Sequence, residues 1–147
     1  MKKIKLCSIG ECMVEISNIK NSIYKQSIAG DTLNFCTYLD KSYFEVYFFT
    51  ALGTTYLSNE TSKFIKKRNI LTNLISKEKN KEIGLYLIHN DNRGEKKFFY
   101  WRDNSAAKLF FNKINFNKYI KFIKTFDYIY FSGITLSILN YSSLRKF

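Results

Sequence analysis

Proline is absent from this sequence, although average usage of about 5% would place roughly seven in a chain of this length. Glycine is also scarce, with six residues among 147, whereas Phe and Tyr number 14 and 11. The abundant residue types have A/T-rich codons and the scarce ones have G/C-rich codons. We therefore attribute the bias to genomic base composition and take no functional assignment from it.

Histidine and cysteine are too few for most metal sites. His89 is the single histidine, so a His-based metal site lacks a second imidazole, and a Ser-His-Asp triad would depend on that one residue. Cys7, Cys12 and Cys36 form no C-x-x-C pair, which argues against a disulfide framework and against a structural zinc site. We expect reduced thiols and no metal site in this chain.

Long apolar runs are missing as well. No run approaches the ~20 residues of a membrane helix, and the basic opening MKKIKLCSIGE has too short an apolar stretch for a signal peptide. We therefore expect a cytoplasmic protein with no membrane partner. With 46% hydrophobic residues among 147, the chain is long enough to form one core.

Basic residues outnumber acidic ones by 24 to 12, which gives a formal net charge of +12. Such a charge raises nucleic acid as a partner. The lysines are nevertheless scattered, and the two richer regions, residues 63–81 and 113–124, fit solvated helix faces. We therefore expect no nucleic-acid partner, and a steep salt dependence of DNA binding would contradict this.

Short apolar runs alternate with helical patterns, which is typical of a parallel α/β sheet. Residues 4–9 predict a first strand, and the continuous apolar run 46–52 predicts a strand buried on both faces. Residues 127–132 predict another buried strand. Each of these three runs is closed by a glycine: Gly10, Gly53 and Gly133.

The sequence also predicts three helices. A helix opening at Gly30 would bury a stripe of Leu33, Cys36 and residues 38–39, with Asp31 or Thr32 as its cap. A second helix is predicted around residues 57–65. The i, i+3, i+4, i+7 spacing of apolar residues predicts a third, amphipathic helix over 116–123.

The remaining β-rich runs come in pairs. Residues 84–89 and 97–102 flank an Asn/Asp/Gly turn and predict a β-hairpin. Residues 12–16 and 23–28 are two further short runs, with an expected turn over 18–22.

Polar groups that suit a sugar gather after the expected strands. Asp31 and Asn34 lie three apart on the first turn of a helix, where both could bond hydroxyls, although a plain helix cap explains them as well. Glu11 follows Gly10 at the carboxyl end of the first strand, where ligands collect in open α/β sheets. No dinucleotide fingerprint and no P-loop occurs in the sequence.

Arg102 ends an aromatic strand and suits capture of a carboxylate or phosphate. The alternative is that it pairs with Asp103 or lies exposed at a strand edge. Tyr86 would share a face with Tyr100 or Arg102 if the hairpin pairs as drawn. An aromatic face with one cation would suit a polyol acid, and a half-buried β pair is the structural alternative.

Taken in order, these segments resemble the pfkB (ribokinase-like) carbohydrate kinases, and among them the kinases of 2-keto-3-deoxygluconate. Each segment alone is a weak signal, whereas the ordered set covers essentially the whole chain. The likeness is carried by Ile9-Gly10-Glu11-Cys12-Met13, Gly30-Asp31-Thr32-Leu33-Asn34, Thr50-Ala51-Leu52-Gly53, Gly84-Leu85-Tyr86, Gly94-Glu95, Phe99-Tyr100-Trp101-Arg102 and Ser132-Gly133-Ile134-Thr135-Leu136.

The resemblance implies a Rossmann-like, ribokinase-type α/β core with a small β-sheet lid. Residues 1–147 would be the N-terminal half of the kinase domain, with lid strands within 12–28 and 84–102. It also implies ATP-dependent phosphorylation of 2-keto-3-deoxygluconate (2-dehydro-3-deoxy-D-gluconate), with ATP and Mg²⁺ as cofactors whose site lies mostly outside this chain. Homo-oligomers through the lid are a further expectation, and the exact sugar acid stays open.

Carried over residue by residue, the family's sugar-binding positions fall in segments 30–34 and 100–102 and at Tyr86 of the expected strand 84–89. Arg102 would face the substrate carboxylate or the transferred phosphate. The expected substrate-binding residues are Gly30, Asp31, Thr32, Leu33, Asn34, Tyr86, Tyr100, Trp101 and Arg102.

The sequence departs from the family at the catalytic base. The family's base is an Asp in a Gly-Ala-Gly-Asp motif, which this sequence lacks, and Ala29-Gly30-Asp31 lies at the sugar side. We therefore assign no catalytic residue in this chain and expect it to be inactive and marginally stable alone. The alternative is a non-catalytic, sugar-acid-binding remnant of such a kinase.

Overall fold

The computed structural model describes residues 2–20, 22–91 and 93–147, which form two four-stranded sheets. The core sheet has the order β5-β4-β1-β8, and all three of its strand pairs are parallel. Its members are β1 (Ile4–Ile9), β4 (Phe44–Leu52), β5 (Ile75–Lys77) and β8 (Tyr128–Phe131). The predicted α/β class with a parallel sheet is therefore confirmed.

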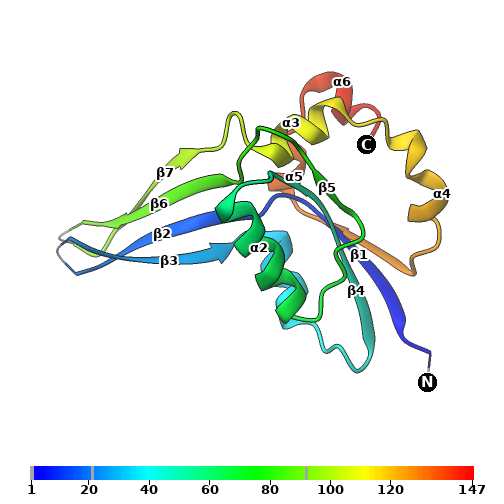
Figure 1. The fold of residues 1–147 in the computed structure, drawn as a ribbon, viewed down its shortest axis with the longest axis horizontal. Helices are drawn as coiled ribbons and strands as arrows, with labels where there is room; N and C mark the ends of the chain where they lie inside the picture. Colours follow the sequence, from blue (N-terminus) through cyan, green and yellow to red (C-terminus); the bar gives the residue numbers. More distant parts are fainter. Residues whose placement is uncertain (1, 21, 92) are drawn as a thin grey trace.

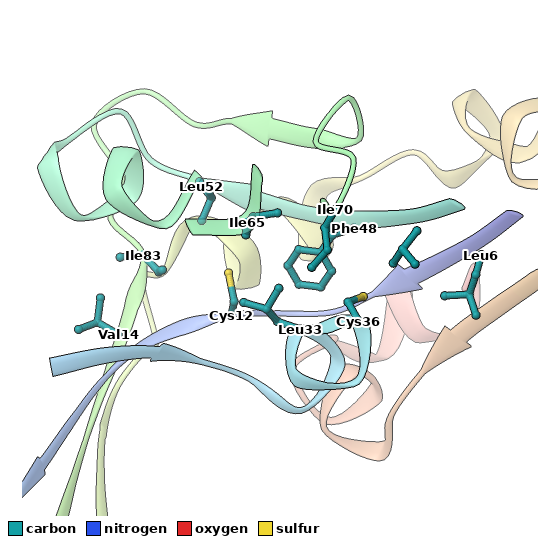
Figure 2. Packing of buried hydrophobic residues seen from close by; sticks show 11 residues of the cluster. Leu6, Cys12, Val14, Leu33, Cys36, Phe48, Leu52, Ile65, Ile70 and Ile83 are labelled. Atoms are coloured by element: carbon teal, nitrogen blue, oxygen red, sulfur yellow. The ribbon is translucent and has the colours of Figure 1, made fainter. Parts of the chain in front are cut away.

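Alternating residues of β1 and β4 build a core on each face of this sheet. On one face, Leu6 and Phe48 pack in a buried cluster with residues of α1 (Asp31–Tyr38) and α2 (Tyr56–Lys67). Figure 2 shows Phe48 close to Leu33 of α1 and to Ile65 of α2. Their neighbours in sequence turn to the opposite face, because side chains along a strand alternate.

The opposite face is covered by α3 (Ala106–Lys113). Cys7, Phe49 and Phe111 are buried there together. Short helical segments continue the chain: η1 (Phe116–Lys118), α4 (Ile120–Ile123), α5 (Gly133–Ser137) and α6 (Tyr141–Leu144). Helices thus cover both faces of the central strands β1 and β4, whose buried residues contribute to a cluster on each side.

The second sheet has the order β3-β2-β6-β7 and extends away from the core as a long arm (Figure 1). Strands β2 and β6 pair in parallel, and the two outer pairs are antiparallel. Its strands are β2 (Met13–Lys20), β3 (Ile23–Ala29), β6 (Gly84–Asn90) and β7 (Lys96–Trp101). Segments far apart in the sequence, 13–29 and 84–101, therefore share one sheet.

The three cysteines are buried free thiols. Burial raises the pKa of Cys7 to about 12 and that of Cys36 to about 11. These side chains therefore act as small hydrophobic groups of the core. No helix in the part of the chain that the structure describes combines the length and apolar character needed to span a bilayer.

Some expected boundaries were wrong at the first helix. Gly30 is the N-cap of α1, and neither Asp31 nor Thr32 caps it, because Asp31 already lies inside the helix and Thr32 is buried. Tyr38 is 89% exposed and does not join the apolar stripe. The expected turn over 18–22 is shorter, since β2 continues to Lys20; residue 21 lies outside the described residues.

Other differences concern short elements. Strand β5 and helix α3 were not predicted from the sequence, and the helix expected over 116–123 is split into η1 and α4, with Tyr119 between them. The expected buried strand 127–132 is β8, but Tyr128 is 60% exposed. The described residues leave the apolar side chains of β8 partly uncovered.

Candidate functional site

A pocket of about 210 Å³ lies where the second sheet meets the carboxyl end of β1. Three strands (β2, β6 and β7), two helices (α1 and α5) and three connecting segments contribute to its wall. It is lined by Glu11, Met13, Gly30, Asp31, Asn34, Tyr86, Phe98, Tyr100, Arg102 and Ile134. The structure thus brings together six of the nine residues expected to bind substrate.

The floor of the pocket depends on a close approach at Gly30. Its φ is +153°, and a Cβ there would lie 2.6 Å from the carbonyl oxygen of Glu11. Only glycine adopts this conformation without strain, so α1 can begin directly against the end of β1. Its first turn then presents Asp31 and Asn34 to the pocket, where their oxygen and nitrogen atoms can meet hydroxyl groups.

One wall is aromatic. Tyr86 of β6 pairs in register with Tyr100 of β7, and their ring centroids are 5.8 Å apart. Phe98 continues the same face, 6.4 Å from each of these rings, because residues two apart on a strand point the same way. These rings offer an apolar surface for the C–H face of a sugar.

The hydroxyl of Tyr86 is already engaged. It donates a hydrogen bond to Glu15, which also accepts one from Ser27 Oγ at 3.1 Å. Burial, and then the bond to Glu15, raise the pKa of Tyr86. Tyr86 therefore presents its ring to the pocket while its hydroxyl is tied to the neighbouring strand.

Arg102 is the cation of the pocket, and its partner is Glu11. The guanidinium donates through Nη2 to Glu11 Oε2, and Ser105 Oγ donates to the other carboxylate oxygen. The alternative pairing with Asp103 is wrong, because Asp103 binds Lys108 Nζ at 2.6 Å. Burial raises the pKa of Glu11 against the lowering effects of Ser105 and Arg102.

Three expected residues do not line this pocket. Thr32 and Leu33 belong to the first turn of α1 but are fully buried, and Trp101 is 60% exposed and lines a separate hollow with Asp103. The register explains Trp101, since residues 98 and 100 face the pocket and 101 therefore faces away. Their binding role stays a prediction that the geometry does not support.

Several lining residues were missed by the sequence analysis. Phe98 could have been found from the alternation of β7, because it shares the face of Tyr100. Met13 and Ile134 are apolar residues without a chemical signature. Ser105 does not line the pocket but binds Glu11 from the start of α3, where it accepts a hydrogen bond from Lys108 N at 3.2 Å. The sequence did not indicate its link to Glu11.

The arrangement suits a small polyhydroxylated acid. An arginine supplies donors for a carboxylate, the start of α1 supplies partners for hydroxyl groups, and the rings supply apolar contact. Among the described residues that line the pocket there is no histidine and no cysteine, and the two carboxylates are Glu11, which is paired, and Asp31. Ligand binding is therefore the chemistry that these residues support directly.

Comparison with known proteins gives matches over nearly the whole chain. A profile described as pfkB family carbohydrate kinase matches residues 3–146. Over 142 residues the chain is 39% identical to a protein of Dickeya dadantii named 2-dehydro-3-deoxygluconokinase, and over 143 residues it is 41% identical to one of the same name in Haemophilus influenzae. These matches cover 94% and 95% of this chain but 46% and 45% of the relatives. The chain thus spans about half the length of the relatives it matches.

Solved structures show the same fold. The 2-dehydro-3-deoxygluconokinase of Thermotoga maritima superposes with a TM-score of 0.78 at 20% identity, over 93% of this chain and 43% of that one. A sugar kinase of Pyrococcus horikoshii in complex with ATP gives 0.76 at 16% identity, over 96% of this chain and 46% of that one. Both alignments confirm the expected ribokinase-like architecture.

Proposed function

This chain belongs to the pfkB family of carbohydrate kinases, and on that premise we propose that it binds the sugar acid 2-keto-3-deoxygluconate as the acceptor of an ATP-dependent phosphoryl transfer. The observation that carries the proposal is the pocket itself. It places Arg102 with Asp31 and Asn34 against an aromatic wall. The names of the relatives, which refer to the 2-dehydro-3-deoxygluconate kinase activity, support the same substrate.

Each part of such an acid has a partner in the pocket. The planar guanidinium of Arg102 matches a carboxylate, and charge-assisted bonds of this kind are roughly twice as strong as neutral ones. Asp31 and Asn34 can bond the hydroxyls of the sugar chain. The rings of Tyr86 and Tyr100 leave one side of the pocket apolar, which suits the C–H face of the same chain.

We assign no residue of this chain to the nucleotide side of the reaction. The sequence has no Gly-Ala-Gly-Asp motif for the base and no P-loop. Among the described residues, no group of three or more His, Cys, Asp or Glu could hold a metal ion. We therefore assign to this chain only the binding and orientation of the acceptor, and ATP and Mg²⁺ to the residues that complete a kinase.

Binding is tested by calorimetry on the 147-residue chain. We expect heat on addition of 2-keto-3-deoxygluconate and much weaker binding of D-fructose, a neutral sugar, because only the acid engages Arg102. Arg102→Lys keeps the charge but not the planar fork, and is expected to weaken binding of the acid. The matched control is Lys63→Ala, an exposed residue of α2 that is paired with Glu60.

Equal affinity for the acid and for fructose, or no heat with either, would refute the proposed acceptor. Incubation of the same chain with ATP, Mg²⁺ and the acid tests the second part, with product followed by phosphorus NMR. We expect no phosphorylated product from the chain alone, and product formation would overturn the division of roles. Binding without transfer in the intact cellular protein would favour the non-catalytic alternative.

A further inference from the structure

Glu11 lines the pocket, but its side chain is almost completely buried. Its side chain is 1% exposed, against 17% for Arg102. Both carboxylate oxygens are used, one by Arg102 Nη2 and the other by Ser105 Oγ. The two partners lie 91 and 94 residues away along the chain. Glu11 therefore joins the end of β1 to the segment that follows β7.

The ion pair is expected to persist when a ligand enters. A buried carboxylate that loses its cation is left as an uncompensated charge, which is strongly unfavourable. Glu11 thus cannot surrender Arg102 to an incoming acid at low cost. An arginine has five N–H donors, and the bond to Glu11 uses Nη2. The Nε is buried and has no partner among the described residues, but the side chain as a whole is 17% exposed and lines the pocket. Donors therefore remain for a second carboxylate.

The surroundings fix the pair in place. Gly84 lies directly beneath it, and a Cβ at that position would lie 2.9 Å from Glu11 Oε1 and 3.3 Å from Arg102 Cβ. A glycine is needed at this position because the side chains of Glu11 and Arg102 already fill the space that a Cβ methyl group of residue 84 would take. Ser105, fixed as the cap of α3, holds the other side of the carboxylate.

We propose that Glu11 is a positioning residue that orients the guanidinium of Arg102, so that its free N–H groups meet the carboxylate of the sugar acid. This inference rests on the proposed function and adds the determinant of its selectivity. The pocket then distinguishes an acid from a neutral sugar by the orientation of the planar guanidinium group of Arg102. A free cation would attract any anion, whereas a paired and fixed one bonds a carboxylate in a single geometry.

The test uses variants that disturb the orientation in different ways. Glu11→Gln removes the charge at nearly constant size, and Glu11→Asp keeps the charge but withdraws it by one methylene. Gly84→Ala leaves both partners present, but its Cβ would lie too close to Glu11 Oε1, so the carboxylate has to shift. We expect each to weaken binding of 2-keto-3-deoxygluconate about tenfold or more, as for a lost bond to a charged group. Binding of D-fructose is expected to be unchanged.

The matched control is Asp103→Asn. Asp103 adjoins Arg102 in sequence and is itself ion-paired, but it does not line the pocket. Its substitution is expected to leave the affinity for both sugars unchanged. A merely structural role for Glu11 would weaken both sugars alike, which would overturn the proposal. Wild-type or tighter binding of the acid by Glu11→Gln would overturn it too, because Glu11 would then compete with the ligand.

A second measurement needs no ligand. The chain has only four arginines, so the side-chain ¹⁵N signals of Arg102 can be assigned by substitution. We expect separate, slowly exchanging Nη signals for Arg102 in the wild type and averaged signals in Glu11→Gln, with the backbone amide spectrum preserved. Averaged signals in the wild type would refute positioning by Glu11. Absence of acid binding by a wild type with fixed Arg102 would instead refute the proposed function.

Discussion

Replacing Arg102 by alanine is expected to destabilise the fold through the carboxylate that it leaves behind. Glu11 is 1% exposed and would keep one hydrogen bond, from Ser105. Removing one partner of a buried ion pair costs about 3–5 kcal/mol, and the remaining bond places the expected loss near the lower end, about 3 kcal/mol. For a domain with a stability of about 5–15 kcal/mol, this is a large share.

The same reasoning predicts rescue by a second substitution. In the double variant Arg102→Ala, Glu11→Gln the buried charge is gone, so the free energy of unfolding is expected to exceed that of Arg102→Ala by about 1 kcal/mol or more. The assay is equilibrium unfolding in urea at pH 7, followed by circular dichroism. Lys63→Ala serves as the exposed control, because Lys63 and Glu60 are 75% and 40% exposed. It is expected to leave the unfolding midpoint unchanged.

Two outcomes would refute this account of the pair. The first is a loss below about 0.5 kcal/mol in Arg102→Ala, which is the range of ordinary surface substitutions. The second is a double variant less stable than the single one, because the carboxylate would then contribute favourably without its cation.

Three further predictions concern the same region. Gly30→Ala should lower the free energy of unfolding by about 1–3 kcal/mol in urea, through strain at φ +153° and the contact with Glu11 O, whereas Gly94→Ala, at φ +81° with open space around it, should cost less. Tyr86→Phe should leave calorimetric affinity for the sugar acid unchanged, because the hydroxyl serves Glu15, and a marked loss would show direct contact with the ligand. Since the pKa of Glu11 is raised above 4.5 in the folded state, the native chain retains a proton that the unfolded chain has already released. The free energy of unfolding should therefore fall as pH rises from 4.5 through the raised pKa of Glu11. The thermal midpoint of the wild type should fall with it, whereas that of Glu11→Gln should not.

The strands of the core were predictable because their signal is local. An apolar-rich run that ends at a glycine marks β1, and a continuously apolar one marks β4, whose burial follows directly from its composition. The same argument failed for β8, whose composition resembles β4 although Tyr128 is exposed. Composition reports what a strand can bury, whereas the elements packed against it decide what it does bury.

Helix α3 was missed although it has a helical signature. Ser105 caps its start, and Ala106, Ala107 and Phe111 share its buried face. Two adjacent phenylalanines at 110 and 111 obscure the periodicity in so short an element. The helix expected over 116–123 has the right period, but it breaks at Tyr119 into two short pieces.

The candidate site was predictable as a set only through the family resemblance. That resemblance grouped Asp31, Asn34, Tyr86 and Arg102 as sugar-binding positions, and the structure places them around one pocket. The partner of Arg102 was not predictable, because sequence proximity favoured Asp103 over a carboxylate 91 residues away. Contacts of that range are fixed by tertiary packing, which one sequence does not display. Self-association through the second sheet stays a prediction.

The central claim is that this pocket is where the sugar acid binds, and methyl NMR tests it most directly. Met13 and Ile134 line the pocket, whereas Ile114 lines a separate hollow of about 440 Å³ beside Lys113 and Lys146. With ¹³C-labelled methyl groups, titration with 2-keto-3-deoxygluconate is predicted to shift the signals of Met13 and Ile134 and to leave that of Ile114 in place. Shifts confined to Ile114, or no shift at any of the three, would contradict the account.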